Sequence, residues 1–320
     1  MNELNLLQQT LGADIMRAFS DESVSEIIVN PDSSLIIEDR DDKHFVGKVD
    51  PKMTRHSISI MCQIADKYIS KESPSATIEL PQNAPFFGAR AQVKIPPMVK
   101  SASMTIRKHL QFKLSLENFL ESEVLDSASY ELIKNALINY DNILVVGKPK
   151  SGKTTLLKAI LNSIPKHSNP KDRIIIMEDT AELEIDMEDV ENTYTIEDVR
   201  SMSDLVKSSV RSRPDRIIVG EVIDGSAYGM LQAWNVGTSG NISTIHANSC
   251  EHTPQRLIDL CHMAGNTSAE SLIASTIQTI VFIEKDITSP AGRRVTEITE
   301  LTGYDHQTKQ FTFNNKYMRK

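Results

Sequence analysis

The run GKPKSGKT at residues 147–154 has the residue types and spacing of a phosphate-binding loop, G-x-x-x-x-G-K-[ST]. Gly147 and Gly152 allow the backbone to curl so that successive N–H groups point at phosphate oxygens. The ammonium group of Lys153 can reach the β- and γ-phosphates, and the hydroxyl group of Thr154 is available to Mg²⁺. The run therefore predicts a site for a nucleoside triphosphate with Mg²⁺.

The residues around this loop have the pattern that such a loop requires. The apolar run NILVVG (142–147) precedes it and is typical of a strand buried on both faces of a parallel sheet. An amphipathic helix pattern follows, and the positive N-terminal end of that helix would point at the anion. We expect ATP to be bound by the consecutive residues Gly147, Lys148, Pro149, Lys150, Ser151, Gly152, Lys153, Thr154 and Thr155.

Acidic residues stand at the ends of two further apolar runs. RIIIME (173–178) ends in Glu178, and RIIVGE (216–221) ends in Glu221. Ligands of an open α/β sheet bind beyond the carboxyl ends of its strands, so both carboxylates should face the phosphates. Nucleotide hydrolysis requires bound Mg²⁺ and an oriented water molecule. Together with Thr154, these two glutamates are the expected Mg²⁺ ligands.

Two more acidic residues, Asp179 and Glu182, follow the first of these runs. An acidic residue after a strand is also a common helix N-cap, and this structural role stays open for Asp179 and Glu221. The second run departs from the usual pattern of apolar residues followed by an aspartate. Gly220 stands at the position of that aspartate, and Glu221 follows it.

His246 ends the run GNISTIH (240–246), which is another expected strand. A single histidine is more often a structural residue than a catalytic one. Its position at a strand end, with Thr244 and Asn248 nearby, favours a residue that senses the γ-phosphate through hydrogen bonds. Metal ligation is disfavoured at this position.

The C-terminal part of the chain alternates apolar runs with helical patterns, which predicts a doubly wound α/β domain. The last two strands, near VTEITEL and QFTF, are expected to form a hairpin across GYDHQTK. Earlier, residues 4–18 and 52–70 have helical periodicity, while 25–29, 34–38 and 86–107 read as strands. We therefore expect an N-terminal α/β domain over 1–115, a linker over 116–130 and the nucleotide-binding domain over 131–320.

Composition excludes several classes of protein. The 320 residues include 43 acidic and 35 basic ones, for a net charge of −8, which disfavours a protein that binds nucleic acid through bulk charge. The N-terminus lacks the layout of a signal peptide and no run suits a membrane span, so we expect a cytoplasmic protein. Three cysteines without metal-ligand spacing, Cys62, Cys250 and Cys261, read as reduced packing residues.

Taken together, GKPKSGKT, IIIMEDTAE, RPDRIIVGEV and GNISTIHANS resemble the Walker A loop, aspartate box, Walker B strand and histidine box of the type II/IV secretion-superfamily traffic ATPases. RPDRIIVGEV and TIHANS are most similar to the conjugal-transfer and type IV secretion branch, the TrbB-type ATPases. SEIIVNPDSSLIIE and GARAQVKIPP in the N-terminal part are also similar to that branch. The resemblance implies a RecA-like P-loop NTPase domain with a smaller N-terminal α/β domain, assembled as a hexameric ring.

The resemblance also implies roles for single residues. Glu182 matches the catalytic glutamate of the aspartate box, Glu221 the Walker B glutamate and His246 the histidine-box residue. Arg90 and Arg107 match N-terminal-domain arginines that reach the phosphates, although an exposed strand often carries arginine for solubility, and this structural role stays open for both. If neither arginine closes over the phosphates, Lys108 is the next candidate. Which of the two glutamates is the base stays open. Two positions depart from the family pattern, which usually has Arg where this chain has Ile223 and commonly has His where it has Thr238.

The resemblance implies a Mg²⁺-dependent ATP hydrolase that powers macromolecule export or conjugative pilus biogenesis. Its expected partners are copies of itself, inner-membrane secretion or pilus-assembly proteins and a coupling ATPase, with no direct nucleic acid partner. We expect it in the cytoplasm, at the periphery of the inner membrane. A pilus-retraction or tight-adherence motor, an assembly platform with negligible turnover, and a single-stranded DNA translocase stay open as alternatives; stimulation of hydrolysis by single-stranded DNA with steep salt dependence would favour the last.

Overall fold

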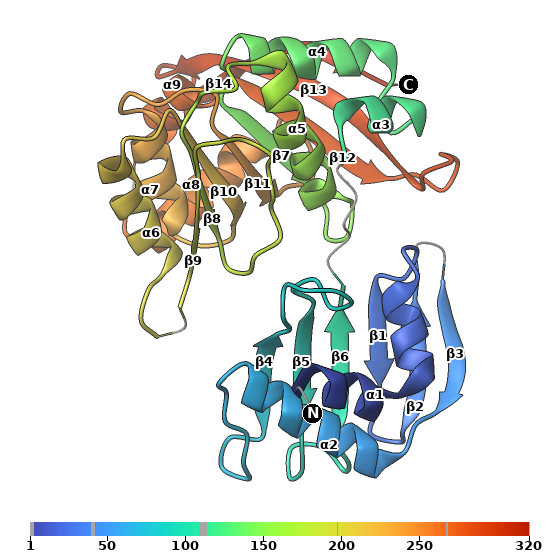
Figure 1. Cartoon of the computed structure of the whole chain (residues 1–320). Coiled ribbons are helices and arrows are strands. Elements are labelled where there is room, and N and C mark those ends of the chain that lie inside the picture. Colours follow the sequence, from blue (N-terminus) through green and yellow to red (C-terminus); the bar gives the residue numbers. More distant parts are fainter. Residues whose placement is uncertain (1–2, 40–41, 109–113, 197, 267, 320) are drawn as a thin grey trace. The chain divides into compact units, whose positions relative to one another are not determined.

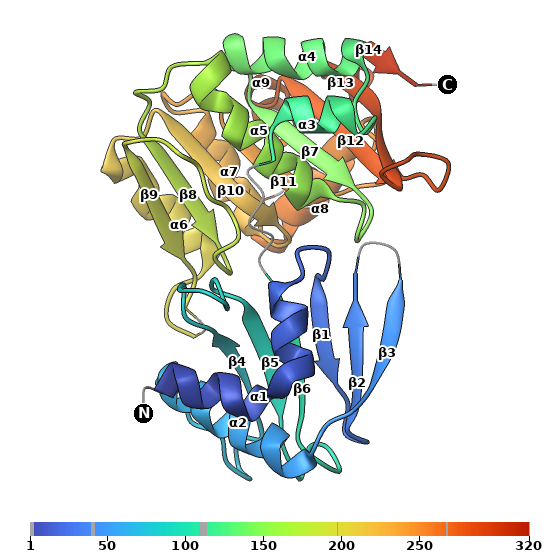
Figure 2. The same ribbon diagram turned by 45° about the vertical axis from the view of Figure 1, so that its right-hand side comes forward.

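The computed structural model (Figures 1 and 2) describes residues 3–39, 42–108, 114–196, 198–266 and 268–319. The chain divides into two compact units, Met1–Phe112 (unit 1) and Lys113–Lys320 (unit 2). Residues 109–113, where the two units join, lie outside the described residues. Within the described part, no helix is long and apolar enough to cross a membrane.

Unit 1 is a six-stranded sheet with two helices on one face (Figure 1). Every neighbouring pair of its strands, in the order β3-β2-β1-β6-β5-β4, is antiparallel. Apolar residues of the helices and of alternate strand positions form one core, as period-2 burial requires. The elements are α1 (Glu3–Ser20), β1 (Glu26–Val29), β2 (Ser34–Glu38), β3 (Lys43–Lys48), α2 (Pro51–Ile64), β4 (Ser75–Glu79), β5 (Arg90–Lys94) and β6 (Ser103–Arg107).

The first helix is broken at Gly12, whose φ of 83° is unsuited to a helix interior. Near its end, Lys108 donates hydrogen bonds to the carbonyl oxygens of Ala18 (2.8 Å) and Asp21 (2.5 Å). Burial lowers the pKa of Lys108, and Asp21 and Glu22 oppose this effect. The ammonium group that sequence suggested as a further phosphate ligand is thus bonded to the C-terminal end of α1.

Unit 2 contains an eight-stranded sheet in the order β14-β13-β12-β7-β11-β10-β8-β9. The strands from β12 to β9 are parallel, and β13 and β14 add an antiparallel hairpin, as the sequence predicted. The sequence did not predict β9, a half-exposed strand at the sheet edge. The strands are β7 (Ile143–Gly147), β8 (Ile174–Glu178), β9 (Val190–Tyr194), β10 (Arg216–Val222), β11 (Ile242–His246), β12 (Thr279–Lys285), β13 (Arg293–Asp305) and β14 (Gln310–Met318).

Helices cover both faces of this sheet, so the doubly wound arrangement is confirmed. One core joins Leu144 and Val146 to α6–α9, and the other joins Ile143 and Val145 to α3–α5. All three cysteines are free and buried, as expected. The helices are α3 (Leu116–Glu121), α4 (Ser127–Ile138), α5 (Lys153–His167), α6 (Met202–Ser209) with the 3₁₀ turn η1 (Val210–Ser212), α7 (Ser226–Trp234), α8 (Thr253–Met263) and α9 (Glu270–Thr276).

Buried polar groups fix the beginnings of the parallel strands. Asn142 Oδ1 accepts hydrogen bonds from the backbone and side-chain N–H groups of Asn241, and Asn241 Oδ1 accepts one from the backbone of Ile217. Arg216 is fully buried, pairs with Asp172 at 2.7 Å and lies over the ring of Tyr140. These groups set the register of neighbouring strands, and therefore the relative heights of the strand ends where the site residues stand.

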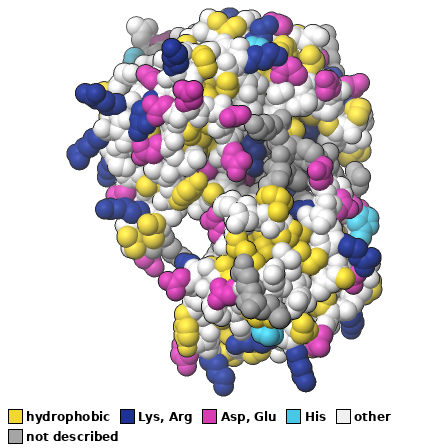
Figure 3. All heavy atoms as spheres, viewed as in Figure 1, with side chains coloured by type: hydrophobic (Ala, Val, Ile, Leu, Met, Phe, Trp, Pro, Cys, Tyr) yellow, Lys and Arg dark blue, Asp and Glu magenta, His cyan; other side chains and the backbone are white. Residues whose placement is uncertain are grey.

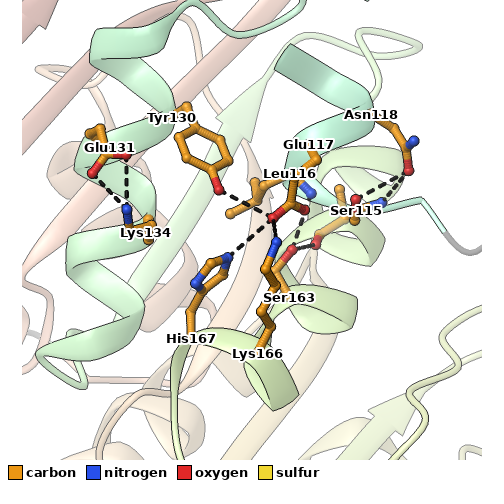
Figure 4. A network of polar contacts seen from close by, with 11 residues as sticks. Ser115, Leu116, Glu117, Asn118, Tyr130, Glu131, Lys134, Ser163, Lys166 and His167 are labelled. Atoms are coloured by element: carbon orange, nitrogen blue, oxygen red, sulfur yellow. Dashed lines mark hydrogen bonds and ion pairs between the residues drawn. The ribbon is translucent and has the colours of Figure 1, made fainter. Parts of the chain in front are cut away.

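Residues 116–130, expected to be a linker, form α3 and the first turn of α4. Their apolar residues are drawn into the core of unit 2, with Leu116 and Leu125 almost fully buried. The helical pattern was too short to recognise from sequence. Figure 4 shows a polar network that holds α3 to α5: the Leu116 N–H donates to Ser163 Oγ, and the Glu117 carboxylate accepts from Tyr130 and pairs with Lys166 and His167.

We expect Glu117→Gln to lower the free energy of unfolding at pH 7 by about 1 kcal/mol, because the carboxylate is partly exposed and screened. Burial raises the pKa of Glu117, but Lys166 and nearby hydrogen bonds outweigh it and hold that pKa at about 2. The stabilisation is complete above the ordinary glutamate pKa and is lost as pH falls towards 2. Urea unfolding of both proteins between pH 7 and pH 3 should show the difference shrinking.

The matched control is Glu131→Gln, which removes a carboxylate paired with Lys134 on the same side of unit 2 (Figure 4). This pair is exposed, so its loss should change stability by at most about 0.5 kcal/mol. An equal effect of both substitutions, or a Glu117→Gln effect that does not depend on pH, would contradict this account of the network.

Candidate phosphate-binding and catalytic site

The predicted phosphate loop lies between β7 and α5, as its sequence requires. Gly152 has a φ of 102° and caps the N-terminus of α5, a conformation that glycine adopts most easily. Gly147 needs its small size, because a Cβ atom there would lie 2.3 Å from the Ile283 carbonyl oxygen and 2.6 Å from Ser151 Oγ. Both glycines of the motif are thus explained by local geometry.

The loop has features of an anion site. Ser151 is buried, and among the described residues its hydroxyl has no hydrogen-bond partner. The helix α5, which follows, presents its N-terminal N–H groups and the positive end of its dipole at the same place. Thr154 and Thr155 are half-buried in its first turn. An orphaned hydroxyl and unpaired N–H groups at a helix start together fit a phosphate group.

Lys153 is the charged centre of the site. Its side chain is only 6% exposed, and its Nζ lies 3.0 Å from His246 Nδ1 and 3.6 Å from Glu221 Oε1. His246 Nε2 lies 3.0 Å from the same carboxylate oxygen. If Lys153 donates to Nδ1 and the Nε2–H group donates to Glu221, then Nδ1 makes no hydrogen bond to the Gly147 carbonyl oxygen, which lies 3.3 Å away. The structure therefore brings together the lysine of the phosphate loop and two residues that the sequence placed at the ends of separate strands.

Burial lowers the pKa of Lys153, and the charge of Glu221 opposes this effect. A buried ammonium group is costly unless an anion compensates it. Glu221 supplies that anion here, although its own side chain is 40% exposed. Lys153 is thus held in place by a partner that a phosphate oxygen could replace.

Glu178 is buried and turned towards the loop that follows β8. Its carboxyl group accepts hydrogen bonds from the N–H groups of Glu182 (3.1 Å) and Leu183 (3.0 Å). Burial raises the pKa of Glu178 to about 8, although these two hydrogen bonds lower it. At neutral pH the group is therefore mostly a neutral acid that fixes the backbone of residues 182 and 183.

The same side chain explains the glycine that replaces the usual aspartate. A Cβ atom on Gly220 would lie 3.2 Å from Glu178 Cγ, closer than ordinary packing allows. The space beside β10 is occupied by Glu178 from β8. Thr244 also bonds to this segment, since its hydroxyl donates to the Gly220 carbonyl oxygen at 2.9 Å. The adjoining Glu221 is left to face Lys153.

Asp179 and the possible Mg²⁺ ligands remain to be located in the structure. Asp179 accepts a hydrogen bond from Thr195, which anchors the segment after β9. Among the described residues no group of three or more His, Cys, Asp or Glu side chains could hold a metal ion. Mg²⁺ on a nucleotide commonly has only one or two protein carboxylates, however, so the donor set of Thr154 and Glu221 suits it.

Arg90 and Arg107 belong to unit 1. They lie directly opposite each other on β5 and β6, and both side chains are exposed. Since residues opposite each other across a strand pair point to the same face, the two guanidinium groups project from one side of the sheet. Glu79 on β4 stands opposite Arg90, and Glu26 on β1 stands opposite Arg107, so a carboxylate flanks each arginine in the same cross-strand row.

Sequence reasoning missed a contribution from α8. His252, Gln255, Arg256 and Asp259 line a cavity of about 390 Å³ together with residues 147–149 and 246–248. Their spacing of three and four residues is that of one helix face, and this pattern was the available signal.

The structure also shows the two positions that depart from the family pattern. The Ile223 side chain is half exposed, and the Thr238 hydroxyl accepts a hydrogen bond from the Asn241 side chain.

Comparison with known proteins shows the family of the chain. The family model described as "Type II/IV secretion system protein" matches residues 9–309. The conjugal transfer protein TrbB of Rhizobium radiobacter is 35% identical over 311 residues, which cover 95% of this chain and 93% of that protein. The type IV secretion system protein PtlH of Bordetella pertussis is 30% identical over 316 residues, covering 87% and 91%.

A solved structure shows the fold. The ATPase DotB of Legionella pneumophila matches 92% of this chain and 81% of its own, with a TM-score of 0.66 and 17% identity. The predicted fold class, an α/β ATPase fold with a smaller N-terminal α/β domain, is confirmed by this likeness.

We expect Glu178→Gln to keep most of the nucleotide hydrolysis, because an amide oxygen can accept both N–H groups as the neutral acid does. Glu178→Leu leaves the buried N–H group of Leu183 and the partly buried N–H group of Glu182 unpaired, at a cost of about 1–3 kcal/mol for the buried group and less for the other. It should lower kcat far more than it weakens nucleotide binding. Steady-state kinetics with a Mg²⁺ titration would separate the effects. A raised Mg²⁺ requirement of Glu178→Gln would show instead that Glu178 is a metal ligand.

Proposed function

Because the chain belongs to the type II/IV secretion system protein family, we propose that it is a Mg²⁺-dependent ATP hydrolase that powers conjugal transfer or export through a type IV secretion apparatus. The curated relatives named above are a conjugal transfer protein and a type IV secretion system protein, and each is matched over most of its length. This favours conjugation and export over pilus retraction. The family also implies that hydrolysis is the activity of the phosphate loop.

The observation that carries this function is the arrangement of Lys153, Glu221 and His246 behind the loop. A buried ammonium group beside a replaceable carboxylate is suited to take up the charge of a phosphate. The unpartnered hydroxyl of Ser151 and the start of α5 supply further donors to the same place. A plain structural turn would need neither a buried lysine nor an orphaned hydroxyl.

Each residue then has a proposed role in hydrolysis. The loop and Lys153 bind the β- and γ-phosphates and stabilise the charge of the transferred phosphoryl group. Glu182, on the loop that Glu178 fixes, accepts a proton from the attacking water. His246 senses the γ-phosphate. Thr154 and Glu221, with Glu178 as a further candidate, would hold Mg²⁺, which supplies positive charge to the phosphate oxygens.

We further propose that the protein acts as a homohexameric ring and that Arg90 and Arg107 bind phosphate oxygens. The planar guanidinium group suits this role because it binds two oxygens at once, which the ammonium group of lysine does not. The cross-strand pairing of the two arginines supports a joint action. The proposed place of action is the cytoplasmic periphery of the inner membrane, with secretion proteins and a coupling ATPase as partners.

Lys153→Ala tests the proposal most simply. We expect hydrolysis to fall by about one to three orders of magnitude, because the phosphoryl group loses its main positive partner while the loop backbone is unchanged. Phosphate release measured on the folded variant is the readout. Lys171→Ala, which removes an exposed lysine of unit 2, is the control and should leave turnover unchanged. Normal turnover in Lys153→Ala would disprove the site.

Glu182→Gln and Glu221→Gln separate the base from the metal ligand. Glu182→Gln should bind ATP almost normally and lose most of its turnover, about a hundredfold or more, because an amide cannot take the proton. Glu221→Gln should recover part of its activity at high Mg²⁺ concentration. Binding and single-turnover measurements on both variants provide the comparison. If Glu221→Gln alone is inactive and Glu182→Gln turns over normally, the two roles are exchanged.

A further inference from the structure

A cavity lies away from the phosphate loop, at the β9 edge of unit 2. It has a volume of about 700 Å³ and is lined by residues 192–194, Ile196 and Arg200, together with α6 and Arg211. Tyr194 and Ile196 are 40% and 56% exposed. Exposed apolar side chains beside the last strand of a sheet are typical of a surface that a partner covers.

This cavity, which we name the basic groove, is positively charged in an acidic protein. Arg200, Lys207 and Arg211 line it and all three are exposed. Its acidic residue, Asp204, accepts hydrogen bonds from the backbone and hydroxyl group of Ser201 and so caps α6. Figure 3 shows basic and hydrophobic side chains next to each other in the region where Figure 1 places α6 and the segment after β9. The groove therefore suits an acidic occupant.

The same chain also carries an acidic surface whose charge is opposite to that of the basic groove. Between β8 and β9, residues 183–188 alternate inward apolar and outward acidic side chains, as an extended segment does. Glu184, Asp186 and Glu188 are exposed, and we name them the acidic ridge. The alternate residues Ile185 and Met187 pack on the core and keep the ridge facing outward.

The spacing of the charged residues and the positions of the two surfaces also fit a contact between the acidic ridge and the basic groove. Carboxylates two residues apart in an extended segment are about 7 Å apart, close to the roughly 6 Å between side chains four residues apart on a helical run such as Lys207 and Arg211. The ridge packs on the core that contains α3–α5, whereas Leu205 of the groove packs on the core on the other face of the sheet. Two different surfaces of one protomer that pair with each other make a heterologous contact, which closes into a ring or grows into a filament.

We infer that the basic groove of one copy receives the acidic ridge of a second copy, so that the two surfaces form the contact between neighbouring unit 2 domains. The inference rests on the proposed ring ATPase and names the surfaces that build it. The ridge begins two residues after Glu182, so an occupied ridge also steadies the loop that carries this residue. Assembly should therefore raise turnover per chain.

A charge exchange tests the contact with the full-length chain. The double variant Lys207→Glu, Arg211→Glu reverses the groove, and Asp186→Lys, Glu188→Lys reverses two ridge carboxylates that have the matching spacing. We expect each to raise the concentration needed for half-assembly by at least about tenfold and to lower turnover at a fixed chain concentration. Combining all four substitutions should restore assembly to within about threefold of the wild type. Sedimentation and light scattering over a concentration series, with phosphate release on the same samples, give both readouts.

The matched control is Lys285→Glu with Lys309→Glu, which changes the net charge by the same amount as the groove variant at exposed positions of β12 and the β13–β14 turn. It should assemble like the wild type. Wild-type assembly of either reversed variant, or failure of the combined variant to recover above the weaker of the two, overturns the inference. If the wild type hydrolyses ATP in that case, the proposed function stands. If the wild type assembles but does not hydrolyse ATP, the proposed function is wrong. In that case the masses measured for the wild type and the variants still decide whether the groove and the ridge form the contact.

Discussion

The buried ammonium group of Lys153 requires a negative partner, and the rest of the site depends on this requirement. In the structure Glu221 fills that role, with His246 bonded to both residues. A neutral environment would favour loss of the lysine proton, and its pKa is indeed lowered by burial. The proposed function then requires that a phosphate group takes over a charge interaction that already exists. In that proposal the nucleotide frees Glu221 for other contacts.

The sheet places these groups because its strands end at controlled heights. Asn142 and Asn241 tie together the beginnings of neighbouring strands, and Arg216 with Asp172 forms a buried ion pair at the same end. These contacts cost desolvation, so their value lies in fixing register rather than in adding stability. The opposite ends of these strands consequently lie close to one another. They carry Gly147, Glu178, Glu221 and His246. Glu178 accepts hydrogen bonds from the loop that carries Glu182, and Gly220 leaves room for the Glu178 side chain.

Much of this could be predicted from the sequence, and the failures have physical reasons. The parallel strands, and the position of the GKPKSGKT loop between β7 and α5, were predicted because buried runs such as NILVVG are unambiguous. The short helix at Leu116 was missed because its few apolar residues are buried only by packing against α5, which a sequence pattern does not show. The contacts of Glu178 could not be foreseen, since a buried acid and an exposed metal ligand look alike in sequence. The edge strand β9 was missed because none of its five residues is fully buried and two are exposed, so it has no buried apolar run.

The exchange of partners at Lys153 is the central claim, and nucleotide binding without Mg²⁺ tests it most directly. Isothermal titration of ADP in the presence of a chelator should be compared for the wild type and Glu221→Gln. Because the variant has no carboxylate competing for Lys153, we expect it to bind ADP more tightly, by about fivefold, which corresponds to about 1 kcal/mol. Equal or weaker binding by Glu221→Gln would contradict the account.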